Sequence, residues 1–169
     1  DAGNGVINMG TLQQSAGDLI LVTNGNGAAT VVNNAAIDFG TSNVGGALDV
    51  TASAGTITQN GGALTVAGTS AFTTSTNDQA ITLSSTSNAL TGAVAFTTGG
   101  TTGNVVIDNG TTALDLAAST ISGTLTATGG ASAGIVDSGN VAVAGNVTLT
   151  TDAGNGVINM GTLQQSAGD

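Results

Sequence analysis

An identical segment of eighteen residues occurs twice in this chain, and it constrains the fold more than any other feature. Residues 1–18 and 152–169 agree at all eighteen positions. The second copy starts 151 residues after the first, so the chain holds one complete period and the start of another. Recurrence at a fixed period is typical of repeat architectures. We therefore interpret residues 1–151 as one full tandem repeat and residues 152–169 as the start of the next repeat.

Short apolar stretches with a period of two recur between these copies, bounded by Gly, Asn, Asp and Ser. This alternation predicts strands, and the glycines supply tight corners. Helices are not expected, because the chain lacks the Glu, Lys and Arg that favour exposed helical positions. The sequence predicts an all-β fold with strands near residues 19–22, 47–50, 63–66, 80–83, 93–96, 105–107, 113–116, 124–127, 140–143 and 146–149.

A finer pattern lies inside the period. The motif apolar-x-Gly-x-apolar-x-apolar surrounds four glycines, and a partial match surrounds Gly68. The central glycines follow one another at nearly even intervals, with one wider interval before the fourth: Gly46, Gly68, Gly92, Gly123 and Gly145. About 20 residues form one coil of a β-solenoid, in which each coil is completed by the coils above and below it. We interpret the wider interval, from Gly92 to Gly123, as a coil with an insertion.

The main alternative is a chain of small β-sandwich domains, one for each period. Three Phe with no Trp or Tyr would give such a sandwich a thin core. Narrow coils lined by Val, Leu, Ile and Ala suit the composition better. We therefore expect a parallel β-helix, or β-solenoid, of seven to eight coils for each 151-residue repeat, with Leu125 and Val147 pointing inward. With strands about 4.8 Å apart, one repeat would advance by about 34 to 38 Å.

Several segments resemble a known family. Residues 55–59, 62–68, 108–110 and 147–149 are similar to the repetitive stalks of filamentous haemagglutinin-like exoproteins and of giant autotransporter or two-partner-secreted adhesins of Gram-negative bacteria. The resemblance is one of composition and coil pattern over essentially the whole segment. It implies a right-handed parallel β-helix exposed at the bacterial cell surface or in the extracellular matrix. The family has no catalytic motif to carry over.

Composition excludes several function classes. The chain has no Lys, Arg, His or Cys, and its formal net charge is −10. Without cationic side chains we expect no nucleic-acid partner. Because the usual general bases and nucleophiles are missing, we predict that the chain is not an enzyme and assign no catalytic or cofactor-binding residue. The segment contains no run of about 18 apolar residues, so we expect no membrane span in it.

Asp and Asn cluster with Gly at residues 1–5, 108–110, 137–140 and 152–156. Oxygen ligands on stacked corners suit a hard cation, which leaves Ca²⁺ open as a cofactor. The glycine-rich nonapeptide calcium repeat is absent, however, and isolated Asp residues usually form turns by accepting backbone N–H bonds. Turn formation is therefore our expectation for these clusters, and we assign no metal ligand.

Two surface patterns receive no functional role. Alternating Thr at residues 56–58 and 124–128 invites comparison with the Thr ladders of ice-binding solenoids. The Thr runs are irregular and separated by coils of different length, so we expect them not to align. Asn109 and Asn146 each begin an Asn-x-Thr sequence, the acceptor pattern for N-glycosylation. Such matches are expected by chance in a chain rich in Asn and Thr.

The leading functional hypothesis is a structural, rod-forming repeat of a very large secreted protein that builds an extracellular or cell-surface filament, sheath or matrix fibre. The alternative is an adhesin stalk whose repeats bind host or neighbouring-cell ligands. A polysaccharide-processing β-helix enzyme is a third hypothesis, although such enzymes normally use basic residues. The expected partners are neighbouring repeats stacked end to end, with identical filaments as lateral partners through divalent cations.

Overall fold

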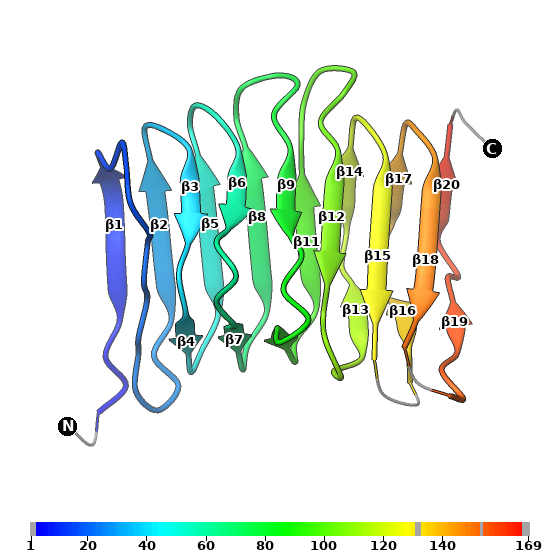
Figure 1. The fold of residues 1–169 in the computed structure, drawn as a ribbon, viewed down its shortest axis with the longest axis horizontal. Helices are drawn as coiled ribbons and strands as arrows, with labels where there is room; N and C mark the ends of the chain where they lie inside the picture. The colour runs from blue at the N-terminus through cyan, green and yellow to red at the C-terminus, as the bar shows by residue number, and fades with distance from the viewer. Residues whose placement is uncertain (1–2, 131–132, 153, 167–169) are drawn as a thin grey trace.

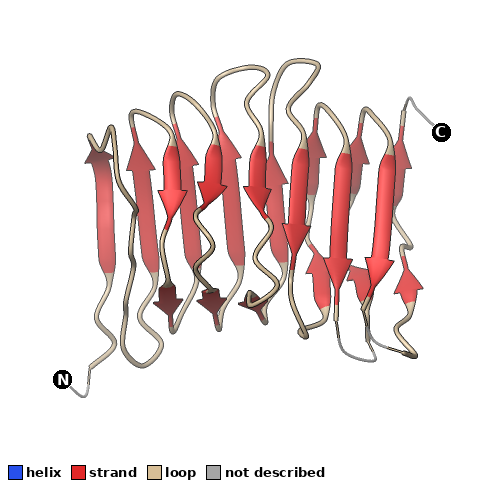
Figure 2. Ribbon diagram, viewed as in Figure 1, coloured by secondary structure: helices blue, strands red, loops and turns tan. Residues whose placement is uncertain are grey.

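The protein is a stack of β-coils in a single series. The computed structural model describes residues 3–130, 133–152 and 154–166. These residues form strands and turns without a helix (Figure 2). Every strand pair is parallel, and each pair joins one coil to the next. The coils follow one another along the long axis, with β1 at one end and β20 at the other (Figure 1). The predicted all-β parallel β-solenoid is confirmed, with about seven turns.

The strands form three sheets. Sheet A contains β1 (Ile7–Leu12), β2 (Ala29–Asn33), β5 (Leu48–Ala52), β8 (Ser70–Thr74), β11 (Val94–Thr97), β13 (Leu114–Leu116), β14 (Ser119–Ile121), β16 (Ile135–Asp137), β17 (Val141–Val143), β19 (Ile158–Asn159) and β20 (Leu163–Gln165). Sheet B contains β3 (Ile37–Phe39), β6 (Ile57–Gln59), β9 (Ile81–Leu83), β12 (Val105–Asp108), β15 (Leu125–Gly129) and β18 (Val147–Thr151). Sheet C contains β4 (Ser42–Val44), β7 (Leu64–Val66) and β10 (Ala89–Leu90).

The coil is right-handed. In Figure 1 the strands of sheet B run downward on the near side, and those of β2, β5, β8 and β11 run upward on the far side. The chain meanwhile advances from left to right. A path of this kind is a right-handed helix, which agrees with the handedness implied by the resemblance and with the usual hand of parallel crossovers.

Inward side chains alternate with outward ones along the strands, as the period-two pattern predicted. The core is made mostly of Val, Leu, Ile and Ala, and burying each larger one contributes on the order of 1.5 to 3 kcal/mol. The three aromatic rings lie together inside it: Phe72 stacks on Phe96 at 5.8 Å and meets Phe39 edge-on at 6.2 Å. Leu125 is fully buried, as predicted. Val147 is half-buried and packs against the core.

The pairing register moves slightly over one repeat. Successive strand pairs place Ile7 in the same column as Asp137, six coils later. Ile158 is the residue equivalent to Ile7 in the next repeat, seven coils later. It pairs with Ile135 and not with Asp137. The register has therefore shifted by two positions over seven coils. Because the shift is even, the inward face stays inward from one repeat to the next.

The glycines of the finer motif stack in two columns. Gly46, Gly68 and Gly92 each stand two positions before a strand of sheet A, whereas Gly123 and Gly145 stand two positions before a strand of sheet B. Neighbours in a column are in direct contact: the Gly68 N–H donates to the Gly46 carbonyl at 3.0 Å. The interpretation of the wider glycine interval as an insertion is therefore wrong. The motif has moved from the corner before sheet A to the corner before sheet B.

Replacing Gly68 by Ala should destabilise the solenoid. A Cβ at this position would lie 2.6 Å from the Gly46 carbonyl carbon and 2.7 Å from the Ala47 nitrogen, so the backbones of two coils would have to separate. We expect a loss of about 1–3 kcal/mol in the free energy of unfolding. Gly154→Ala is the control, because a Cβ there meets nothing within 4 Å. Equal denaturation midpoints for the two variants would contradict the close-contact explanation.

Candidate functional site

The acidic clusters engage protein atoms rather than one another. The Asp108 carboxylate accepts the Gly110 N–H at 2.8 Å, which confirms the expected turn for that cluster. Asp137 instead bonds to Gly161 and Thr162, a contact between coils that sequence reasoning missed. Residues 1, 2 and 153 of the terminal clusters lie outside the described residues. Within residues 3–130, 133–152 and 154–166, no three acidic side chains gather into a group that could hold a metal.

The Asp78 carboxylate connects two adjacent coils by hydrogen bonds. The Asp78 backbone has a φ of 62°, the left-handed conformation, and its carboxylate bonds to the coil that follows. One oxygen accepts the N–H groups of Thr101 and Thr102 at 2.7 and 2.8 Å. The Thr102 hydroxyl donates to the same oxygen at 3.1 Å. These bonds, the Thr101 backbone bond foremost, hold the pKa of the Asp78 carboxyl below its usual value.

Asp137 makes a similar set of bonds with the second copy of the repeated segment. Its two oxygens accept the N–H groups of Gly161 and Thr162 at 2.7 and 2.6 Å. The Thr162 hydroxyl also donates to the carboxylate at 2.6 Å. This hydroxyl bond is the largest cause of a lowered Asp137 pKa, and the two backbone N–H bonds add to it.

Two buried asparagines imitate a strand partner. The Asn33 side chain accepts the Gln14 N–H and donates to the Gln14 carbonyl, both at 2.9 Å. Asn109 does the same with Leu90, at 2.8 and 3.0 Å. Each amide therefore occupies the place of a peptide group in the ladder between coils. Both side chains are fully buried, and burial makes any unpaired group beside them costly.

Buried hydroxyls also occur in matched pairs. The Ser42 hydroxyl accepts the Leu21 N–H, and the Ser119 hydroxyl accepts the Phe96 N–H, each at 3.0 Å. Both serines donate to a carbonyl two positions earlier. Thr23 and Thr98 form a third pair: each hydroxyl donates to a glycine carbonyl in the following corner and accepts a backbone N–H from the next coil.

These pairs reveal a second repeat at about half the period. The interval from Asn33 to Asn109 is nearly the same as the intervals from Ser42 to Ser119 and from Thr23 to Thr98. Each interval is about half of the 151-residue period, which holds about seven coils, so it corresponds to three and a half coils.

Because the interval includes half a coil, equivalent strands lie in different sheets. By this spacing β2, β5 and β8 of sheet A correspond to β12, β15 and β18 of sheet B. In the same way β3 and β6 of sheet B correspond to β13 and β16 of sheet A.

Some threonines align, contrary to our expectation. In the run at residues 124–128, Thr126 and Thr128 pair with Thr148 and Thr150 on the next coil of sheet B, whereas Thr58 pairs with Asp38.

A longer column of threonines lies on sheet A. Thr51, Thr73, Thr97 and Thr120 are in register on four successive coils of sheet A. Unequal coil lengths do not disturb this column because the extra residues are placed in the turns. The adjacent outward column contains Asp49, Ala71 and Ala95, so the hydroxyls are spaced regularly in one direction only.

The two glycosylation patterns differ in their setting. Asn109 has no exposed surface, and both atoms of its amide bond to backbone groups, so the folded chain does not offer it to a modifying enzyme. Asn146 is exposed in the turn before β18. Of the two Asn-x-Thr sequences, the one at Asn109 therefore places its asparagine in the core, where it bonds to the backbone of the neighbouring coil.

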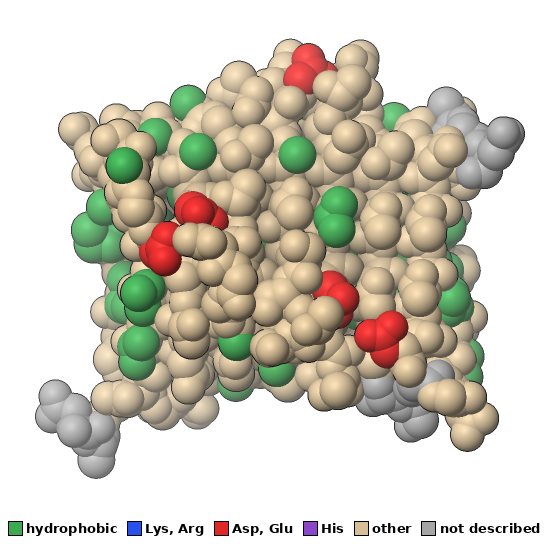
Figure 3. Space-filling view, in the orientation of Figure 1, with side chains coloured by type: hydrophobic (Ala, Val, Ile, Leu, Met, Phe, Trp, Pro, Cys, Tyr) green, Lys and Arg blue, Asp and Glu red, His purple; other side chains and the backbone are tan. Residues whose placement is uncertain are grey.

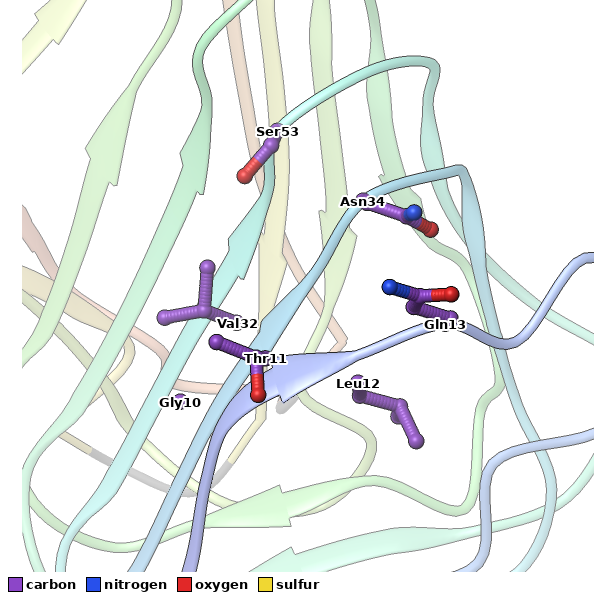
Figure 4. A pocket seen from close by; sticks show the side chains of 7 residues that line it. All are labelled: Gly10, Thr11, Leu12, Gln13, Val32, Asn34 and Ser53. Atoms are coloured by element: carbon purple, nitrogen blue, oxygen red, sulfur yellow. The ribbon is translucent and has the colours of Figure 1, made fainter.

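The surface hollows are shallow and lined mainly by neutral side chains. One hollow of about 250 Å³ lies at the C-terminal end of β1, beside Thr11, Val32 and Ser53 (Figure 4). Another of about 350 Å³ runs over Ala71 and Ala95 with Asp49 at its edge. In Figure 3 carboxylates are scattered over a mostly uncharged face. The described part of the chain contains no helix that could span a membrane.

Comparison with known proteins gives one match. The model of a family described as Repeats of unknown function (DUF5649) matches residues 26–97 and again residues 102–167. The interval between the starts of the two matches equals that between Asn33 and Asn109. One 151-residue period therefore contains two family units. No curated protein and no solved structure matches the chain.

Removal of the Asn109 amide should weaken the fold. Asn109→Ala leaves the buried N–H and carbonyl of Leu90 without their partner, and we expect a loss of about 2–4 kcal/mol in the free energy of unfolding. Chemical denaturation measures it. Asn43→Ala is the control, since Asn43 is exposed on β4, and it should change stability by no more than about 0.5 kcal/mol. Equal losses would contradict the role of the buried amide.

The Asp137 bonds should also make stability depend on pH. Because they favour the ionised carboxylate, its folded pKa lies below the ordinary 3.8. The stabilisation is therefore present above about pH 4 and lost as the pH falls through the folded pKa. Asp137→Asn should lower Tm at pH 7, and the difference from the natural chain should shrink as the pH falls below about 4. Asp49→Asn, which removes an exposed charge, is the control; a pH-independent difference for Asp137→Asn would refute the assignment.

Proposed function

The chain belongs to the family described as Repeats of unknown function (DUF5649), and we propose that it is a structural, rod-forming repeat of a very large secreted protein. The observation that carries this proposal is that the first and last described coils share one sequence and are joined by an unbroken series of parallel pairings. A fold of this kind grows by adding copies, so its length is set by their number.

The contacts between coils suit a load-bearing shaft. Neighbouring coils are joined by backbone ladders, by glycine corners in direct contact, and by buried side chains such as Asn33, Ser42 and Thr98 that bond across coils. These bonds run along the rod axis, and bending the rod would stretch them on one side. Stiffness in a long filament is the property that such contacts provide.

The surface composition favours an exposed setting. The chain has ten acidic residues and no Lys or Arg, so its charge favours solubility and it contains no peptide bond that trypsin recognises. Together with the resemblance of its coil pattern to exported bacterial stalks, this leads us to place the parent protein outside the cell, in a surface filament, sheath or matrix fibre.

Imaging of the native parent protein tests the proposal. Antibodies raised against the 169-residue chain should label intact, unpermeabilised cells of the producing organism. Electron microscopy of the labelled structures should show layers about 4.8 Å apart along the axis and a longer repeat of about 34 Å, seven coils in length. Labelling only after permeabilisation, or labelling of compact particles without the axial layers, would overturn it.

A further inference from the structure

The structure contains the repeated segment in two different surroundings. The first copy has a coil after it, and the second copy has a coil before it. Because the two sequences are identical, the contacts of one copy are available to the other. The two sets of contacts can therefore be compared atom by atom.

Toward the following coil, the first copy pairs β1 with β2 and makes further backbone bonds at the ends of that ladder. The Ile7 N–H donates to Ala28 at 3.0 Å, and the Leu12 carbonyl accepts from Asn34 at 3.0 Å. The backbone of Gln14 pairs with the Asn33 amide, as described above. A side chain contributes as well: the Asn4 amide oxygen accepts the Asn26 N–H at 2.9 Å.

Toward the preceding coil, the second copy uses other positions. The carbonyls of Val157 and Thr162 accept from Ile135 and Val141 at 2.9 and 3.2 Å. The Ser166 N–H donates to Val143 at 3.0 Å. Gly161 and Thr162 give their N–H groups to Asp137.

These two sets share no position of the segment. Contacts with the preceding coil involve the residues equivalent to Val6, Gly10, Thr11, Gln13 and Ser15. Contacts with the following coil involve Asn4, Ile7, Leu12 and Gln14. Within a strand, adjacent residues direct their polar groups to opposite sides, which explains how neighbours in sequence serve different coils. One copy can therefore make both sets at once.

The irregular part of the segment explains the place of Asp137. In the first copy the pairing register slips between Met9 and Leu12. In the second copy the equivalent residues lie in the gap between β19 and β20. Gly161 and Thr162 thus fall outside the regular ladder, and the Asp137 carboxylate accepts the N–H groups that a strand partner would otherwise accept.

We infer that the outer face of the last coil, residues 154–166, is the docking surface for a second copy of residues 19–45, so that one repeat continues into the next as an uninterrupted solenoid. The face is apolar where the contact is needed: the Ile158 side chain is 47% exposed. Ile7, the equivalent of Ile158, packs against the core once its following coil is present. The inference deepens the proposed function and rests on its premise that copies are joined in series.

A chain extended by one further 151-residue period tests the inference. Hydrogen exchange at the Ile158 N–H is the readout, because the equivalent Ile7 N–H is already bonded to the following coil. In the extended chain Ile158 should exchange at least about tenfold more slowly than in the 169-residue chain, approaching the rate of Ile7. An unchanged rate at Ile158, or two separate unfolding transitions for the two periods, would overturn the inference.

A matched pair of variants assigns the protection to the predicted contact. In the extended chain, Asn33→Ala in the added copy should speed exchange at Gln165, whereas Asn33→Ala in the original copy should speed exchange at Gln14 and leave Gln165 unchanged. The amide of Ile81, in the middle of the first period, reports whether each variant is folded. The same response to both variants would contradict the docking surface. Protection at Ile158 together with a parent protein confined inside cells would refute the proposed function alone.

Discussion

The parallel backbone ladder between coils is the constraint on which the rest of this structure depends. Each coil has only a few residues in each strand, and it is completed by polar groups of the coils before and after it. Contacts of this kind leave little room between backbones at the corners. That explains why Gly46, Gly68 and Gly92 stack in direct contact. Where the ladder lacks a strand beside Leu90, the buried side chain of Asn109 bonds to the backbone in its place.

Sequence reasoning reached most of the strands that it predicted, the coil length and the inward position of Leu125, because alternation and glycine spacing are local patterns. The strand predicted at residues 19–22 is wrong, since these residues form two isolated bridges, and β2 and β8 are among the strands that were not predicted. It did not reach features that depend on which residues of different coils meet. The Thr51 to Thr120 column escaped notice because turns of different length hide it in the linear sequence. The structural role of Asn109 was not predicted, because the Asn-x-Thr pattern gives no indication of burial. Asp137 looked like a turn former because its partners are in the next coil.

The half-period repeat shows how strongly local sequence determines these coils. Ser42 stands in sheet C and Ser119 in sheet A, yet both hydroxyls make the same pair of backbone contacts. The surrounding corner, and not the sheet, sets the role of the residue. This also accounts for the wide interval between Gly92 and Gly123, which marks the step from one family unit to the next.

The three-and-a-half-coil spacing gives the rod an approximate twofold screw axis. Each family unit is turned by about half a revolution relative to the one before it and displaced by about 17 Å along the axis. Positions that face outward on sheet A in one unit face outward on sheet B in the next. The rod is consequently two-sided, so that a molecule fitted to one flank meets a related surface on the opposite flank, half a repeat farther along.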